Sequence, residues 1–293
     1  MKGQIAAALT AIGVFLAVPA HAETVNAFGP AVANPNDPTL TPDDSWFLFD
    51  VKANGTASIV DLTGEGGALE NDQPLAKGAA KLTTGASDAD KAEIGITRLG
   101  GYGTIGDFLS AGSSMSYSYF KDSTGDPNPS AAAAIKLTVF DADISTGGTT
   151  DGFATFVYEP TWNLGTVGTS VAVTPDQWLT ALITGDSGVF WHTGIYGAPG
   201  IAGFGGDGRT LEDWDDFFGG DLLSATIIGI SIGVGSFNQG QTAYVDDVQF
   251  TSGNIDLNFD FEPTVVPLPG AALFLLTGLA GLGAASWRRR RTA

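Results

Sequence analysis

The sequence predicts an all-β protein, an antiparallel β-sandwich of jelly-roll type with long glycine-rich loops. Two observations favour this class. Apolar segments are short, are separated by turn residues, and in several cases alternate strictly between apolar and small or polar side chains. No segment of the middle of the chain keeps a helical apolar period for more than two turns.

The middle of the chain, residues 23–262, is long enough to form one hydrophobic core without help. Domains of this size remove roughly three quarters of their unfolded surface from water. The chain has no cysteine, so it folds without disulfides wherever it is located. We therefore predict a single domain.

Regular structure is expected to begin at residues 46–51, WFLFDV, after an irregular segment rich in Pro, Asn and Asp. Within 226–234, alternation predicts two faces, one with Ile228, Ile230, Ile232 and Val234 and the other with Gly229, Ser231 and Gly233. After residues 46–51, the predicted strands are 57–62, 93–99, 115–120, 135–140, 153–159, 169–173, 226–234, 242–250 and 255–261.

Two short helices are predicted within this framework. In RTLEDWDDFF, Thr210 is a suitable N-cap, and acidic residues fill the first turn near the positive end of the helix dipole. A second helix is expected to start at Thr174-Pro175, because proline suits the first helical position. Neither helix is long enough to organise the fold.

Residues 1–22 have the layout of a secretory signal peptide. Lys2 is followed by an apolar run from Ile5 to Val18, and Ala20 and Ala22 form an A-x-A cleavage site. We expect this signal helix to be removed after Ala22, which places the mature protein outside the cytoplasm.

The middle of the chain is strongly acidic. Residues 23–262 hold all 32 acidic residues but only 8 basic ones, a net charge of −24. Such a field repels nucleic acid and anionic lipid, which excludes both as partners. It is compatible with a soluble secreted protein, with saline surroundings, or with binding of divalent cations.

Three catalytic or nucleotide-binding patterns occur in the wrong context. GDSG at 185–188 resembles the nucleophile stretch of chymotrypsin-like proteases, but the one histidine of residues 23–293, His192, follows the serine too closely to be its base. GISIG at 229–233 matches the hydrolase elbow, yet it lies in a predicted strand with no histidine after it. GYGTIG at 101–106 lacks a βαβ unit and is interpreted as a loop.

Two places are candidate calcium sites. Asp141 and Asp143 begin a segment with the oxygen spacing of a calcium loop, although Gly147 and Gly152 depart from the EF-hand pattern. Asp246 and Asp247 are adjacent in a strand, so they point to opposite faces, and at least one must meet solvent, a cation or a hydrogen-bond donor. A structural Ca²⁺ is the one cofactor that we predict.

The stretch around Asp246, YVDDV, resembles the last strand of the jelly-roll domains in secreted carbohydrate-binding modules. The resemblance covers about twenty residues and implies that an aspartate here helps to hold a structural calcium ion. It also implies a domain that contacts carbohydrate.

The last predicted strand carries four polar side chains on one face: Asp256, Asn258, Asp260 and Glu262. Carboxylates two residues apart on a strand are about 6.5–7 Å apart, a spacing that glycosidase acid pairs use. A secreted polysaccharide hydrolase or lyase using Asp260 and Glu262 is therefore one alternative. A half-buried strand with a solvated acidic face is the interpretation that we favour.

Aromatic side chains gather among glycines between residues 185 and 220. Sugars stack their apolar faces on flat rings, and loops on a rigid sandwich commonly carry such rings. Trp191, Tyr196 and Trp214 are therefore the candidate glycan-binding residues. The alternative is that these rings fill one end of the core, and His192 is expected to be a core or loop residue rather than a metal ligand.

The C-terminal segment 263–293 contains three parts in order. Two prolines precede a 17-residue apolar run from Ala271 to Trp287, just long enough to span a bilayer as a short transmembrane helix. The arginine cluster after it would stay in the cytoplasm. The residues of the motif are Val266, Pro267, Leu268 and Pro269, and the cluster is Arg288, Arg289, Arg290 and Arg291.

This tail is similar to the VPLPA variety of the PEP-CTERM sorting signal, with Gly270 where the family has alanine. The resemblance implies a Gram-negative bacterium that makes extracellular polysaccharide, transient insertion in the inner membrane, processing by exosortase, and final location at the cell surface or in the matrix. We predict a non-catalytic surface protein that contacts polysaccharide, with a hydrolase or lyase and a self-assembling structural protein as alternatives.

Overall fold

The computed structural model describes residues 22–125, 128–141, 152–166, 169–185, 187–195 and 208–264. The predicted signal peptide, apart from Ala22, and the sorting motif with its arginine cluster lie outside these residues. Within them, no helix has the length and apolar character needed to cross a bilayer.

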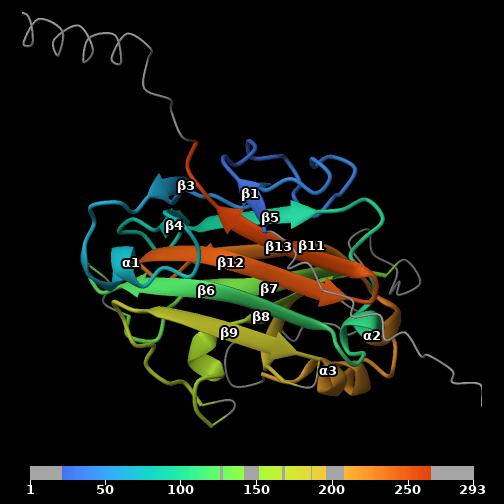
Figure 1. Ribbon diagram of the computed structural model, residues 1–293. Helices are drawn as coiled ribbons and strands as arrows, with labels where there is room; N and C mark the ends of the chain where they lie inside the picture. The colour runs from blue at the N-terminus through green and yellow to red at the C-terminus, as the bar shows by residue number, and fades with distance from the viewer. Residues whose placement is uncertain are drawn as a thin grey trace, which may run out of the picture.

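Two β-sheets stacked face to face form the described part of the chain, which confirms the predicted β-sandwich (Figure 1). The seven-stranded sheet contains β1 (Glu23–Val25), β3 (Thr56–Asp61), β4 (Gly78–Thr83), β6 (Ser114–Asp122), β9 (Trp178–Thr184), β12 (Thr242–Ser252) and β13 (Ile255–Phe261). Its pairs are antiparallel except for β1 with β13, which is parallel.

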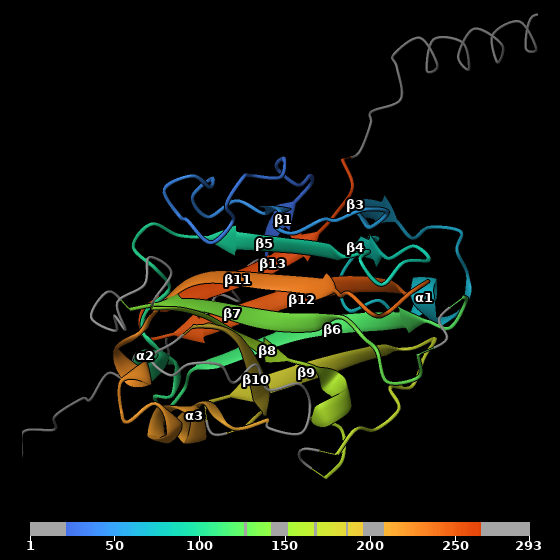
Figure 2. The same ribbon diagram turned by 180° about the vertical axis from the view of Figure 1, so that it is seen from behind.

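The second sheet has six strands in the order β10-β8-β7-β11-β5-β2, all paired antiparallel (Figure 2). These strands are β2 (Phe47–Leu48), β5 (Ala92–Thr97), β7 (Ala134–Phe140), β8 (Phe153–Tyr158), β10 (Phe190–Ile195) and β11 (Thr226–Val234). The short helices are α1 (Gly67–Asn71), α2 (Ile105–Phe108), α3 (Leu211–Phe217) and two 3₁₀ turns, Pro160–Trp162 and Leu222–Ser224.

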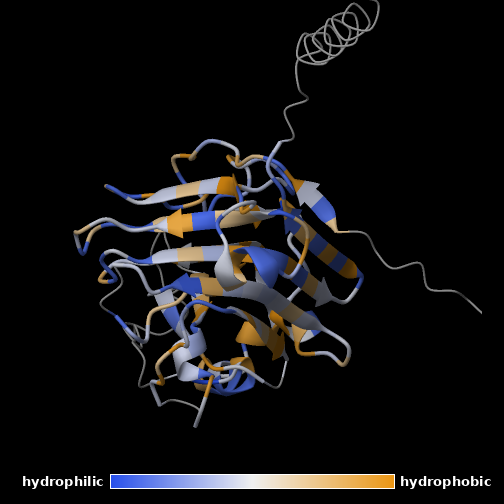
Figure 3. Ribbon diagram, turned by 60° about the vertical axis from the view of Figure 1, so that its left-hand side comes forward, coloured by the Kyte–Doolittle hydropathy of each residue, from blue (hydrophilic) through white to orange (hydrophobic). Residues whose placement is uncertain are grey.

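The core lies between the sheets and is built from alternate residues of each strand (Figure 3). Tyr117 and Tyr119 of β6 face it from one sheet and Phe156 of β8 from the other. Trp46 closes one side, with ring centroids 5.4 Å from Phe259 and 5.0 Å from Phe261. The alternation predicted for residues 255–261 is confirmed, because Phe259 and Phe261 are buried and Asp256 is exposed.

The alternation predicted for β11 holds except at Ile228. A register shift between Ile227 and Gly229 turns Ile227 into the core cluster, and Ile228, although buried, lies outside that cluster. A β-bulge adds one residue to a strand and so reverses the side-chain alternation on one side of it. From Ile230 onward the predicted faces are correct.

The predicted helix at Thr210 is confirmed as α3, and the Thr210 side chain accepts a hydrogen bond from the Asp213 N–H. The helix predicted at Thr174-Pro175 is wrong. Asp176 has φ of +57°, which no right-handed helix allows, and its carboxylate accepts hydrogen bonds from the Ser123 backbone and hydroxyl. The chain instead enters β9 at Trp178.

The strand predicted at 169–173 is also wrong. The Val171 N–H donates to the Thr161 carbonyl and the Val173 N–H to the Pro129 carbonyl, each at 2.9 Å. Thr161 lies in the 3₁₀ turn Pro160–Trp162 and Pro129 in the connection before β7, so the segment bridges two connecting segments and joins no ladder. Val173 is buried there, which accounts for its apolar character.

Candidate functional site

A groove lies on the outer face of the six-stranded sheet, where β7 and β10 begin and β8 ends. It consists of a cavity of about 280 Å³, whose lining includes Trp191, Glu159 and Lys136, and an adjoining cavity of about 390 Å³ that contains Trp162. Both cavities share Glu159 and the loop residues Ser236, Phe237 and Asn238. We refer to the two together as the groove.

Strand register places the groove's side chains. Trp191 of β10 is paired with Val157 of β8, which is paired with Lys136 of β7, and Lys136 with Ser231 of β11. Because paired residues project to the same face, these four form a row across the sheet. Their neighbours along the strands, such as Ile135 and Phe156, belong to the core, so the row faces away from it.

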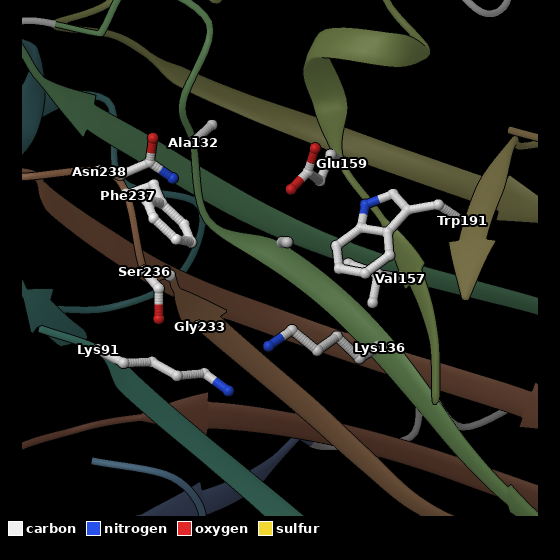
Figure 4. A pocket seen from close by; sticks show the side chains of 12 residues that line it. Lys91, Ala132, Lys136, Val157, Glu159, Trp191, Gly233, Ser236, Phe237 and Asn238 are labelled. Carbon is white, nitrogen blue, oxygen red and sulfur yellow. The ribbon is translucent and has the colours of Figure 1, made fainter. Parts of the chain in front are cut away.

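Small residues make the floor of the groove. Ala132, Ala134 and Gly233 line the first cavity on the side of the six-stranded sheet. A Cβ at Gly233 would lie only 2.9 Å from the Cβ of Glu93, so this position has no space for a side chain. Short floor residues between longer walls leave the hollow that Figure 4 shows.

Two aromatic rings stand on opposite sides of that hollow (Figure 4). Trp191 is half-buried, and its indole donates a hydrogen bond to Glu159. Phe237 is 72% exposed and projects from the loop after β11 with φ of +68°. Two hydrogen bonds fix this loop, from the Phe237 N–H to the Asp88 carbonyl at 3.0 Å and from the Asn128 amide to the Asn238 side chain at 2.7 Å.

Glu159 joins the two cavities. Its Oε2 accepts a hydrogen bond from the Trp162 indole at 2.8 Å, so the carboxylate is held between two tryptophans. Burial raises the pKa of Glu159 above its ordinary value, and the two indole hydrogen bonds and the nearby Lys136 only partly oppose this. Such a group can accept or donate hydrogen bonds to the hydroxyls of a bound molecule.

Beneath the cavity, Glu93 is shared by two lysines. Lys91 Nζ lies 2.7 Å from Glu93 Oε2, Lys136 Nζ contacts the same oxygen, and the Ser231 hydroxyl donates to Oε1 at 2.6 Å. Burial alone would raise the pKa of Glu93, but Lys136 and Lys91 outweigh it and lower the pKa to about 2. Burial lowers the pKa of Lys136, which has the smaller exposed fraction of the two lysines.

The predicted glycan-binding residues separate in the structure. Trp191 lines the groove, whereas Tyr196 lies outside the described residues. Trp214 is 0% exposed and its indole donates to the Phe190 carbonyl at 2.8 Å, so it fills the core and cannot stack on a sugar. The core alternative is thus the correct one for Trp214.

His192 also belongs to this buried aromatic cluster. Its ring centroid lies 4.6 Å from that of Trp214 and 5.4 Å from that of Phe218. Neither ring nitrogen has a hydrogen-bond partner in the part of the chain that the structure describes. Burial, with a contribution from Arg209, lowers the pKa of His192, so the ring is kept neutral.

Asp246 and Asp247 have different environments. Asp246 is 0% exposed, and its Oδ1 accepts a hydrogen bond from the Phe261 N–H at 3.0 Å. Asp247 has φ of +50° at the bulge of β12, and its carboxylate accepts from the Gln249 amide at 2.8 Å. Asp141 accepts from the Ser224 hydroxyl at 2.9 Å, and Asp143 lies outside the described residues.

The environment of Asp246 gives it an unusual pKa. Burial is the largest cause, and the carboxylates of Asp260 and Asp247 add to it, so that the pKa of Asp246 rises from 3.8 to about 7. Asp246 Oδ2 and Asp260 Oδ1 are buried oxygens without a hydrogen-bond partner among the described residues. These residues contain no group of three or more His, Cys, Asp or Glu side chains placed to hold one metal ion.

The strand acids considered for catalysis lie away from the groove. Glu262, just after β13, accepts a hydrogen bond from the Gly78 N–H at 3.0 Å. Neither Asp260 nor Glu262 lines the groove. The sequence pattern therefore identified two acids of the seven-stranded sheet, whereas the groove lies on the other sheet.

Comparison with known proteins finds similar solved structures at low sequence identity. One similar solved structure is a family 11 carbohydrate-binding module from Clostridium thermocellum in complex with a β-1,3-1,4-mixed-linked tetrasaccharide, with 14% identity, 74% of this chain and 90% of that chain covered, and a TM-score of 0.34. A putative sugar-binding protein from Bacteroides thetaiotaomicron has 12% identity, coverages of 78% and 95%, and a TM-score of 0.41.

A third similar structure is a cellulose-induced protein, with 12% identity, 71% of this chain and 90% of that chain covered, and a TM-score of 0.35. No protein-family model and no curated protein matches the chain. The ligand of this chain has to be argued from its own groove.

Stability is expected to depend on pH through Asp246. Its pKa is about 7 in the folded state and near 3.8 when exposed, so the folded state binds the proton more tightly. This contribution to the free energy of unfolding is fully present below about pH 4 and is lost as the pH rises to about 7. In metal-free buffer, Asp246→Asn should match the wild type near pH 4 and have the higher Tm at pH 8.

Asp256→Asn is the matched control for that experiment, because Asp256 is exposed on the neighbouring strand β13. It removes the same charge from the same sheet and should shift the Tm far less between the two pH values. A Tm difference between Asp246→Asn and the wild type that is equal at pH 4 and pH 8 would contradict the assignment.

Proposed function

We propose that the protein is an exported surface or matrix protein whose β-sandwich binds extracellular polysaccharide in the groove without cleaving it. The observation that carries this proposal is the groove itself: two aromatic rings, Trp191 and Phe237, face each other across a floor of small residues. Sugar rings are flat enough to lie between such walls, and their apolar faces pack well on aromatic rings.

The polar groups of the groove suit the hydroxyls of a sugar. Glu159, Asn238 and Ser236 line both cavities and offer hydrogen-bond acceptors and donors there. Thr161 and Ser170 continue this polar lining in the second cavity. A hollow with aromatic walls and a few convergent polar groups is the usual form of a small-ligand site. Two joined cavities fit a chain of several sugars.

Binding is tested with the protein as it is exported and the extracellular polysaccharide of the producing organism. Affinity electrophoresis through gels with and without this polysaccharide should show retarded migration, and dextran gels serve as the control. Migration unaffected by the polysaccharide would overturn the proposal. Concentration-dependent polymers without any retardation would favour the self-assembling structural protein.

The sorting part of the proposal rests on the tail of the sequence. Export by the signal peptide and exosortase processing after membrane insertion are supported by the motif at Val266–Pro269 and the arginines at 288–291. If this is correct, replacing Pro267 and Pro269 by alanine should leave a longer, unprocessed form in the membrane fraction, as measured by immunoblot. Unchanged size and location of the product would contradict it.

A structural calcium ion is a further part of the proposal. Asp246 Oδ2 and Asp260 Oδ1, two buried oxygens without partners, are the ligands that the described residues offer. Calcium needs six to eight oxygens, so backbone carbonyls and water would supply the others. EDTA should lower the Tm at pH 7.5 and Ca²⁺ should restore it, whereas Asp246→Asn should not respond; a Tm unchanged by EDTA would remove the metal.

A further inference from the structure

Cationic side chains are scarce in this protein, yet two of them meet in the groove. Of the 8 basic residues between positions 23 and 262, Lys91 and Lys136 both line the cavity that Trp191 walls. Lys136 belongs to β7 and Lys91 directly precedes β5, and their ammonium groups approach each other on one side of the cavity (Figure 4). With only 8 basic residues in the segment, two ammonium groups that line one cavity are a local concentration of cationic hydrogen-bond donors.

The two lysines are held in place from below. Glu93, whose side chain is only 3% exposed, contacts both ammonium groups, and Lys91 also pairs with Asp50 at 2.7 Å. An ammonium group has three N–H donors, and Glu93 occupies one of those of Lys136. Glu93 fixes the positions of both ammonium groups, and the N–H donors of Lys136 that Glu93 does not use can donate to a carboxylate in the cavity.

We propose that the groove recognises a sugar that carries a carboxylate, as a uronic acid residue of a polysaccharide does, and this rests on the polysaccharide binding proposed above. The carboxylate of the sugar meets Lys136 and Lys91, and the ring of the sugar packs on Trp191. Hydrogen bonds between ammonium and carboxylate groups are about twice as strong as those between neutral groups.

The groove fits one negative charge on the lysine side. Glu159 lies on the opposite side of the cavity from the two ammonium groups, where a second anion would meet a carboxylate (Figure 4). The net charge of −24 on residues 23–262 would also repel a chain with a charge on every sugar. A polysaccharide with carboxylates spaced among neutral sugars satisfies both conditions.

The test compares one polysaccharide in two chemical forms. The producer's extracellular polysaccharide is used native and after carbodiimide–borohydride reduction, which converts its carboxylates to neutral hydroxymethyl groups. Titration calorimetry of the exported protein at low salt should show about tenfold or more weaker binding of the reduced form. Raising the salt to 0.5 M should weaken binding of the native form and leave that of the reduced form unchanged.

The matched variants are Lys136→Gln and Lys77→Gln, the second at an exposed lysine distant in sequence from the groove. Lys136→Gln should bind the native form more weakly and lose most of the preference for it over the reduced form, and Lys77→Gln should behave as the wild type. Equal binding of both forms by the wild type, with no salt effect, overturns this inference and leaves the proposed function standing. Absence of binding to either form overturns both this inference and the proposed function. If Lys136→Gln fails to fold, the salt dependence of binding by the wild type is the deciding measurement.

Discussion

Trp214→Ala is expected to lower the free energy of unfolding by about 3–5 kcal/mol, the usual cost of removing a large aromatic side chain from a core. Trp214 is fully buried, and its ring packs against His192, Phe217 and Phe218, with centroids 4.6–5.8 Å away. Truncation leaves a cavity and removes one of the two hydrogen bonds that the Phe190 carbonyl accepts, the other coming from the Arg209 N–H. Urea denaturation followed by tryptophan fluorescence or circular dichroism measures the loss.

Trp214→Phe is the control for this result. It keeps most of the ring volume but cannot donate to the Phe190 carbonyl, so its cost should be smaller, about 1–3 kcal/mol. A loss below about 1 kcal/mol for Trp214→Ala would show that the ring does not fill the core as described. Polysaccharide binding by any folded Trp214 variant should remain, because Trp214 does not line the groove.

Trp191→Ala should have the opposite pattern, with weaker polysaccharide binding and little change in stability. Its ring walls the groove and is half-buried, so truncation creates no closed cavity in the core. Loss of an aromatic contact at the centre of a binding site typically costs about 2 kcal/mol, or roughly thirtyfold in Kd. Affinity electrophoresis gives the change in binding, and a thermal melt should show a Tm within a few degrees of the wild type.

Trp191→Phe separates stacking from hydrogen bonding. Phenylalanine keeps a flat ring but loses the hydrogen bond to Glu159, which still has the Trp162 indole as a donor. If the ring is what binds the sugar, Trp191→Phe should keep most of the affinity that Trp191→Ala loses. Wild-type affinity in Trp191→Ala would exclude the groove as the polysaccharide site.

The strands that the sequence predicted well are those with continuous β-branched and aromatic residues, such as β7 and β11. Strands β1, β4, β9 and β10 were missed; in β4, the residues Gly78, Ala79 and Ala80 have low strand propensity on their own. They form a strand since β3 pairs with all three and β12 pairs with Ala80. The small side chains of β4 suit its tertiary packing, which cannot be recognised from the local sequence pattern.

The groove was only partly predictable for a related reason. Trp191 and Trp214 belong to the same aromatic stretch, but the register of β10 turns Trp191 outward, whereas α3 buries Trp214 in the core. Phe237, an aromatic residue among Gly235, Asn238 and Gly240, was a signal that could have been used. The convergence of Lys91 with Lys136 could not have been predicted, because it depends on β11 lying between β5 and β7.

The parallel pairing of β1 with β13 joins the two extremes of the domain. Glu23 lies beside Phe259 and Val25 beside Phe261, and the Glu262 N–H donates to the Val25 carbonyl at 3.0 Å. A contact between such distant positions closes nearly the whole domain into one loop. Closing so long a loop costs conformational entropy, so this contact is expected to form late in folding. Residues 23–25 can therefore reach their place only after the final strand has been synthesised, and amide protection at Val25 would report completion of the chain during folding.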